Sequence, residues 1–286
     1  MTMAVSALFI DSFDAEVKSA YQGIKSLRSS VRVKTGVVGS THRFPKAGAG
    51  VATQHNRGND VVAMNAGRDK VTVTLSDWDA FDYEDILDIN KLNFDDKKII
   101  ADSTVKAIGR REDQLIIDAL TAEITNLTNL SPTQLVGGGT AKMTVEYLGS
   151  ASAILDANNV PSEDRTILIT AKQKQQLLEE TEVTSSDYNT VKSLVQGDID
   201  TFYSFKFITI GNRTEGGLPR AQGVEQYSFA YHKDAVGLAI GKDMTTMVDW
   251  VPQKTAWQIG CVYSAGAVVI DLYGVVVINT DDSPTP

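Results

Sequence analysis

Two short segments with alternating apolar and polar residues, 31–35 and 71–75, enclose about 35 residues with little hydrophobic periodicity. Both segments, VRVKT and VTVTL, have the period of two that is typical of a half-buried β-strand. The residues between them are rich in glycine, asparagine and small side chains. A connection of this length without secondary structure is unusual inside a compact domain. The pattern predicts that the two segments pair as a hairpin, which projects from the body and becomes ordered on a neighbouring chain.

A long amphipathic helix is predicted over about 93–124. Asn93 can cap it, and the two aspartates at the start of its first turn suit the helix dipole. Ile99 and Ile117 fall on the far side of the predicted apolar stripe, which indicates a second packing surface. The stripe itself comprises Ala101, Val105, Ile108, Leu115, Ala119 and Leu120.

Glu112 is an exception, because its charge falls inside this apolar stripe. A buried charge needs a partner. One interpretation is an ion pair with an arginine, either Arg111 or one from a neighbouring chain. The other is a catalytic carboxylate, which would make the protein a hydrolytic enzyme. No second catalytic group is evident in the sequence.

Helix and strand patterns alternate after Pro132 and the glycines at 137–139, which mark a boundary between two lobes. The segment 143–155 has a helical apolar face, and 166–170 is predicted to be a buried strand. Thr170 and Gln173 form a T-x-x-Q capping box that opens the next helix. Further strands are predicted at 205–210, at 227–231 and in the last 40 residues. The fold class is therefore α+β.

The chain carries few signatures of chemistry. Gly237–Asp243 faintly resembles a phosphate-binding loop but is one residue short and lacks the Ser or Thr, so a turn between apolar elements is expected. The single cysteine, Cys261, excludes a Cys-based zinc cluster, and the three histidines have no metal-ligand spacing. The most apolar run, 266–278, is broken by Asp271 and is shorter than the roughly 20 residues that span a bilayer. We expect no catalytic residue, cofactor, metal or membrane partner.

Charge is distributed unevenly along the chain. The formal net charge of -9 argues against a protein that coats nucleic acid with its whole surface. Residues 17–59 contain eight basic residues and no acid, whereas residues 76–102 contain nine acids and three lysines. Complementary surfaces on neighbouring chains are one interpretation, and two separate solvated faces are the other. The candidate contact residues are Arg32, Lys34, Arg43, Lys46, Arg57, Asp77, Asp79, Asp82, Glu84 and Asp85.

Several stretches, taken in order, resemble the major capsid proteins of tailed bacteriophages. They are VRVKTG (31–36), HRFP (42–45), AIGRREDQLIIDAL (107–120), RTILITAKQ (165–173) and FAYHKDAVGLA (229–239). The order of arm, hairpin, long helix, mixed lobe and late strands is similar to the coat-protein fold of tailed phages, herpesvirus capsid floors and encapsulins.

The resemblance implies a division of the chain into four parts. They are an N-terminal arm at 1–30, an extended E-loop hairpin at 31–75, a peripheral domain at 76–129 and 242–263, and an axial domain at 130–241 and 264–286. The spine helix of the peripheral domain would be the helix at about 93–124.

The resemblance also implies a function and partners. Such a subunit assembles into the hexamers and pentamers of an icosahedral shell around double-stranded DNA, which is enclosed but not specifically bound. A separate scaffolding protein and a portal are expected partners. The protein would belong to the virion and assemble in the host bacterial cytoplasm. An encapsulin-type nanocompartment shell is the near alternative, and an enzyme that uses Glu112 is the distant one.

Overall fold

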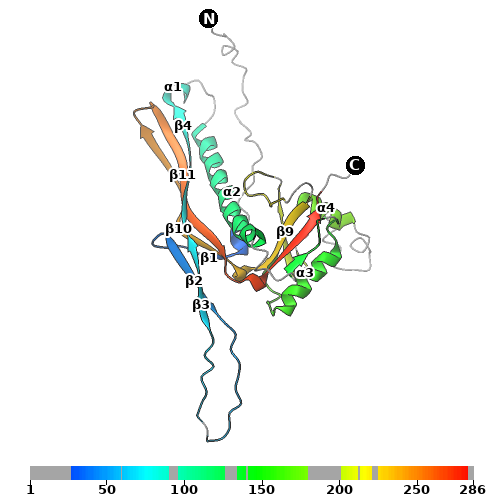
Figure 1. The fold of residues 1–286 in the computed structure, drawn as a ribbon. Coiled ribbons are helices and arrows are strands. Elements are labelled where there is room, and N and C mark those ends of the chain that lie inside the picture. Colours follow the sequence, from blue (N-terminus) through cyan, green and yellow to red (C-terminus); the bar gives the residue numbers. More distant parts are fainter. Residues whose placement is uncertain are drawn as a thin grey trace.

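The computed structural model describes residues 27–58, 60–89, 96–125, 134–139, 141–179, 201–211, 213–220 and 225–282. These residues form two sheets with flanking helices and a hairpin that projects far from the body (Figure 1). The mixture of helix and sheet agrees with the predicted α+β class. Within the described ranges, no helix is both long and apolar enough to cross a membrane.

The first sheet has four strands in the order β1-β10-β11-β4. Its centre is a long antiparallel ribbon made of β10 (Val236–Val251) and β11 (Ala256–Val269). The edges are β1 (Arg32–Lys34), parallel to β10, and β4 (Ser76–Asp85), antiparallel to β11. The short helix α1 (Ile86–Ile89) follows β4, and the long helix α2 (Asp96–Thr125) runs beside the ribbon (Figure 1).

The second sheet has six strands in the order β5-β12-β9-β6-β8-β7. Two helices, α3 (Val145–Ala157) and α4 (Ala171–Glu179), belong to this lobe. Short 3-10 turns, η4 (Lys233–Ala235) and η5 (Leu272–Gly274), carry the chain between the two sheets. The strands are β5 (Leu135–Val136), β6 (Arg165–Thr170), β7 (Thr201–Phe202), β8 (Phe205–Ile210), β9 (Glu225–His232) and β12 (Val275–Asp281).

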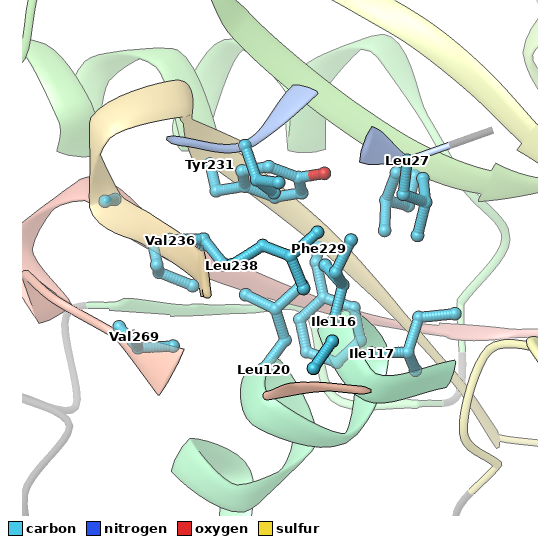
Figure 2. Packing of buried hydrophobic residues seen from close by; sticks show 14 of the residues in the cluster. Leu27, Ile116, Ile117, Leu120, Phe229, Tyr231, Val236, Leu238 and Val269 are labelled. Atoms are coloured by element: carbon cyan, nitrogen blue, oxygen red, sulfur yellow. The ribbon is translucent and has the colours of Figure 1, made fainter. Parts of the chain in front are cut away.

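Alternation along β6 divides the hydrophobic core of the second sheet. Ile167 and Ile169 pack in the cluster beneath α3, whereas Leu168 belongs to the main core on the other face. Apolar side chains from α2, the six-stranded sheet and β10 converge in that main core (Figure 2). Leu27, the residue immediately before η2 (Arg28–Ser30), packs there as well. The N-terminal end of the described chain is therefore part of the junction between the lobes.

The projecting hairpin consists of β2 (Thr41–Ala47) and β3 (Arg68–Thr74). Its ladder ends where the Gly48 N–H donates to the Gly67 carbonyl at 2.7 Å. Beyond that point, the described residues 49–58 and 60–66 extend away from the body without regular secondary structure (Figure 1). The prediction of a projecting segment is confirmed.

Several sequence predictions are confirmed in detail. The long helix spans Asp96–Thr125, close to the predicted 93–124, although Asn93 lies outside the described residues. The strand predicted at 205–210 is β8, with the same bounds. The capping box is present, because the Gln173 N–H donates to Thr170 Oγ1 at 3.1 Å and the Thr170 N–H donates to Gln173 Oε1 at 2.8 Å.

Two predictions about strands were wrong. The segment at 31–35 does form a strand, but β1 pairs in parallel with β10 through Arg32 and Gly237, and β3 pairs with β2 instead. The second error concerns Gly237–Asp243, which is not a turn but part of the continuous strand β10. Glycine is required there because a side chain at Gly237 would meet Phe44 and Ile270 at 2.8 and 2.9 Å.

The buried face of α2 is rotated from the predicted stripe. Val105 is 38% exposed, whereas Ile117, predicted to lie on the far side, is 1% exposed. The buried residues of the described part of α2 are Thr104, Ile108, Gly109, Glu112, Asp113, Ile116, Ile117 and Leu120. Two of these are carboxylates, so the face could not be recognised from apolar spacing alone.

Candidate functional site

Glu112 has no solvent exposure. Its carboxylate lies 3.9 Å from the Arg28 guanidinium, which also donates through both terminal nitrogens to Asp243 at 3.0 and 2.7 Å. The Tyr263 hydroxyl also faces Glu112, and burial raises the pKa of Tyr263. The predicted partner Arg111 lies instead over the Trp78 ring, at 3.6 Å from its centroid. Glu112 is therefore held by an arginine of its own chain.

The neighbouring Asp113 is also fully buried and ties three segments together. It accepts hydrogen bonds from the Leu27 N–H and from the Arg213 guanidinium, both at 3.0 Å. Nearby, Ser30 and the Tyr231 hydroxyl are 2.6 Å apart, and burial raises the pKa of Tyr231. These contacts join the N-terminal segment to α2, to the loop at Arg213 and to β9, so they serve the structure of the junction.

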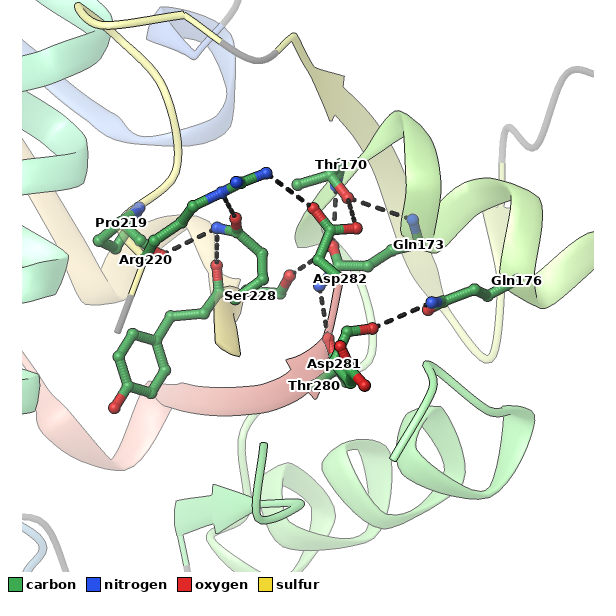
Figure 3. Close-up of polar contacts among 11 residues, drawn as sticks. Thr170, Gln173, Gln176, Pro219, Arg220, Ser228, Thr280, Asp281 and Asp282 are labelled. Atoms are coloured by element: carbon green, nitrogen blue, oxygen red, sulfur yellow. Dashed lines mark hydrogen bonds and ion pairs between the residues drawn. The ribbon is translucent and has the colours of Figure 1, made fainter. Parts of the chain in front are cut away.

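A second polar network centres on Gln173, at the start of α4 (Figure 3). Beyond the capping box, its Oε1 accepts from Ser228 Oγ at 2.7 Å and its Nε2 donates to Thr280 Oγ1 at 2.8 Å. One turn later, Gln176 donates to the Asp281 carbonyl at 3.0 Å. These bonds join α4 to β9 and β12, so this network is also structural.

The candidate contact residues lie on two separate surfaces. Arg43 and Lys46 are on β2, Arg57 is in the extended loop, and Arg32 and Lys34 are on β1. Lys46 bonds within the chain, to Asp271 Oδ1 at 2.9 Å. The other four basic side chains are exposed. Among the described residues, no ion pair joins this basic set to the acids of β4.

The five acids of β4 have different surroundings. Asp77, Asp79 and Asp82 are exposed. Glu84 is 5% exposed, and its carboxylate lies 3.9 Å from the Lys97 ammonium. Asp85 caps α1 by accepting from the Leu87 N–H at 2.8 Å. The exposed acids are therefore the three nearest the start of the strand.

Alternation along β4 decides which of these acids face α2. Trp78 and Glu84 contact α2 residues, so the even-numbered side chains lie on the α2 face. Asp77 and Asp79 lie on the opposite, outer face of the sheet, whereas Asp82 shares the inner face at an exposed position.

The outer face has an apolar centre and an acidic edge. Register places Asp79 beside Val262, and Phe81 beside Gly260. A side chain at Gly260 would collide with the Phe81 ring, so the ring lies across the glycine backbone. A groove of about 530 Å³ continues this face to the base of the hairpin, with Asp77, Asp79 and Lys242 among its lining residues. In the described part of the chain, no helix covers this face (Figure 1).

The extended loop offers apolar side chains as well as charge. Val51 is 79% exposed and Val61 is 87% exposed, and Val62 and Met64 are 66% and 59% exposed. Large apolar side chains grouped on an exposed segment are typical of an interaction surface. The sequence predicted no metal ligand or nucleophile in this loop or on the outer face. Within the described residues, no group of three or more His, Cys, Asp or Glu side chains could hold a metal ion.

The chain is similar to known proteins in its sequence family and in its fold. A sequence family described as phage capsid protein matches residues 5–282. No curated protein sequence matches the chain significantly.

Solved phage capsids share the fold at low sequence identity. The capsid of cyanophage P-SCSP1u is similar with a TM-score of 0.73 and 16% identity, over 99% of this chain and 96% of that one. The head of Helicobacter pylori bacteriophage KHP40 has a TM-score of 0.74 and 14% identity, over 99% of both chains. The capsid of Ralstonia phage GP4 has a TM-score of 0.73 and 11% identity, over 100% of both chains. The predicted coat-protein fold is confirmed.

Proposed function

This chain belongs to the phage capsid protein family, and from that membership we propose that it is the major subunit of an icosahedral bacteriophage head. The predicted class of function, a bacteriophage capsid protein of the virion, is confirmed by the family match over residues 5–282. The observation that supports the shell-forming role is the pair of exposed, oppositely charged surfaces on the hairpin and on β4. Family membership also favours a phage capsid over an encapsulin-type compartment and a structural role over a hydrolytic one.

The proposed assembly has several components. Copies of the chain form hexamers and pentamers around double-stranded DNA, which is enclosed without specific contacts. A separate scaffolding protein and a portal act in assembly, which takes place in the host bacterial cytoplasm. The subunit is proposed to have a structural role without a cofactor or a catalytic residue, and the placement of the buried Glu112 beside Arg28 supports a structural role for that carboxylate.

The proposed domains divide the first sheet and leave the second sheet whole. The peripheral domain is 76–129 and 242–263, which contain β4, α2 and the outer part of the β10–β11 ribbon. The axial domain is 130–241 and 264–286, which contain all six strands of the second sheet. The arm is 1–30, most of which lies outside the described residues, and the segment 31–75 contains the edge strand β1 and the E-loop hairpin of β2 and β3.

The proposed contact places the extended loop of one copy on the outer sheet face of the next. Arg43 and Arg57 supply positive charge, and Asp77 and Asp79 supply the complementary negative charge. Val51, Val61, Val62 and Met64 meet the apolar centre around Phe81 and Val262. Lys46 and Glu84 take less part, because each is already engaged within its own chain.

The two edges of the four-stranded sheet support a head-to-tail arrangement. Arg32 and Lys34 are exposed on the edge strand β1, whereas Asp77 and Asp79 are exposed on the opposite edge strand β4. A surface with opposite charges on its two sides fits a second copy in the same orientation. Head-to-tail contacts that close by rotation generate rings, as hexamers and pentamers require.

The expected energies are small for each contact. Exposed ion pairs contribute about 0–1 kcal/mol each, so they affect register and association rate more than stability. We expect Arg57→Glu to slow assembly, and Asp77→Lys or Asp79→Lys in the partner to restore part of the rate. Asp82→Lys, on the inner face of the same strand, should rescue less.

Light scattering of single and paired charge reversals, measured across salt concentrations, tests this contact. Lys206→Glu is the matched control, since Lys206 is exposed on β8, away from both surfaces. The proposal is wrong if no acidic position rescues Arg57→Glu and if added salt leaves the wild-type rate unchanged.

A further inference from the structure

The base of the hairpin has a small hydrophobic core of its own. Phe44 and Val73 are 2% and 3% exposed and pack with Ala239 and Ile270, apart from the two larger clusters. The T-shaped contact between His42 and Phe44, with centroids 4.7 Å apart, extends this packing along β2. The hairpin is therefore attached to the body by a limited contact at its base.

Two glycines allow the hairpin to approach the sheet this closely. Gly237 lies beneath Phe44, and a side chain there would meet the ring at 2.8 Å. A side chain at Gly266 would collide with the backbone oxygen of Thr74 in β3. The contact thus depends on bare backbone in β10 and β11, and it forms one fixed point.

Lys46 supplies a second point of attachment. It lies two residues after Phe44, so both side chains share one face of β2. Its ammonium is 2.9 Å from Asp271 Oδ1 and 5.8 Å from the centroid of the Tyr273 ring. Asp271 Oδ1 also accepts from the Tyr273 N–H at 3.2 Å, which fixes the carboxylate at the start of η5. The ion pair therefore links the hairpin to the connection between the two sheets.

The geometry makes this second point important for the tip. Ten residues separate Ala47 from Arg57, and at roughly 3.3 Å per residue the arm is about 33 Å long. A tilt of about 10° at the base would move the tip by about 6 Å, which is twice the length of a hydrogen bond. The apolar contact alone allows such a tilt, whereas a second attachment two residues further along β2 restricts it.

We propose that Lys46 is a positioning residue, which with Asp271 sets the direction of the hairpin before any second copy binds. This inference rests on the proposed function and extends it. A hairpin that is already held in one direction loses less conformational entropy when Arg57 binds the surface of a second copy. It also reassigns Lys46, which the sequence suggested as a contact between subunits. Its partner is Asp271 of the same chain.

Distances between spin labels in the unassembled subunit test the proposal directly. Thr53→Cys in the loop and Ser162→Cys in the second lobe are both exposed positions, and Cys261→Ser removes the only natural thiol. We expect Lys46→Glu to broaden the distance distribution about twofold and to shift its mean by about 3 Å, because Thr53 lies six residues, or roughly 20 Å, beyond Ala47 and a tilt of about 10° moves it by that amount. Lys46→Arg should retain the wild-type distribution, and Lys46→Glu combined with Asp271→Lys should restore it.

The control is another exposed ion pair that does not touch the hairpin. Lys106 and Asp102 pair at 2.6 Å on α2, and their charge swap should leave the distances unchanged. A Lys46→Glu distribution identical to wild type overturns the proposal. Altered distances with an unchanged assembly rate would leave Lys46 as a positioning residue and would count instead against docking of the hairpin on a second copy.

Discussion

At the scale of single residues, the junction between the lobes depends on the buried carboxylate of Asp113. Two of its partners come from distant segments, Leu27 before the hairpin and Arg213 in the loop before β9. Removing one member of a buried pair leaves the other charge without compensation, which costs more than the pair itself contributes. Asp113 therefore matters more to stability than an ordinary helix residue does.

We expect Asp113→Ala to lower the free energy of unfolding by about 3 kcal/mol, because the Arg213 guanidinium is only 16% exposed and loses its carboxylate. Urea denaturation of the unassembled subunit measures this. Asp118→Ala, at an exposed position of the same helix, should change the free energy by less than about 0.5 kcal/mol. Equal effects of the two substitutions would contradict the assignment.

Gln173 is the second residue with a large expected effect. Its side chain makes three hydrogen bonds, to Thr170, Ser228 and Thr280, with no solvent exposure. Gln173→Ala should destabilise the subunit by about 2–4 kcal/mol, since it leaves buried polar partners unsatisfied. Gln175→Ala, which removes only an exposed bond to Glu179, serves as the control in the same denaturation series. A loss below about 1 kcal/mol for Gln173→Ala would show that water replaces these bonds.

The sequence predicted the environments of Gln173 and Glu112 to different degrees. The capping box was recognisable because Thr170 and Gln173 are three positions apart, and local spacing fixes their contact. The anomaly at Glu112 was also visible, but its partner Arg28 was not. The pairing of Arg28 with Glu112 depends on how the segment around Arg28 packs against α2. Local sequence patterns do not predict a contact between segments so far apart in the chain.

At the scale of elements, the hairpin divides into a paired base and an unpaired loop. Amide hydrogen exchange of the isolated subunit should show slow exchange in β2 and β3 and fast exchange over 49–66, since the ladder ends at Gly48 and Gly67. In assembled particles, the loop should gain protection, because its ordering depends on contacts with another chain. Strong and equal protection of the loop in both samples would refute this.

Strand existence was easier to predict than strand pairing. The alternation at 31–35 and 71–75 identified both strands correctly, because it reflects which side chains face the core. It contains no information on the partner, and β1 pairs with β10 far along the chain. The glycines of β10 suggested a turn for a related reason. They mark the close approach of other side chains, Phe44 and Ile270 at Gly237 and Leu75 at Gly241, which the sequence alone does not distinguish from a turn.

At the scale of the whole molecule, the net charge of -9 limits contact with the genome. Binding of the free subunit to random duplex DNA at ~0.15 M salt should be weak, because nonspecific affinity depends on phosphate neutralisation by basic residues. Fluorescence anisotropy with a labelled duplex measures it. The triple variant Asp77→Lys, Asp79→Lys, Asp82→Lys should bind more tightly and lose that gain in high salt. Submicromolar binding by the wild-type subunit would contradict the prediction.

The overall fold was accessible from the order of parts, even though no single stretch was diagnostic. The hairpin, the long helix, the mixed lobe and the late strands occur in the predicted order along the chain. Solved capsids with 11–16% identity share this arrangement. What stayed hidden was the direction of the hairpin. It is set by Phe44, Lys46 and the turn at Asp271, whose contacts join residues more than two hundred positions apart.

The junction between the lobes also has a consequence for the timing of synthesis. Arg28 precedes its partner Asp243 by 215 residues. At about 5–20 residues per second on the ribosome, roughly 10–45 s pass between the emergence of the two. The hairpin is translated early, but the sheet face that would receive a neighbour lacks β10 and β11 until the last fifth of the chain appears. A nascent chain can therefore present its own loop to finished subunits long before its sheet face can bind the loop of another subunit. Until the chain is released, subunits would add to it through its loop only.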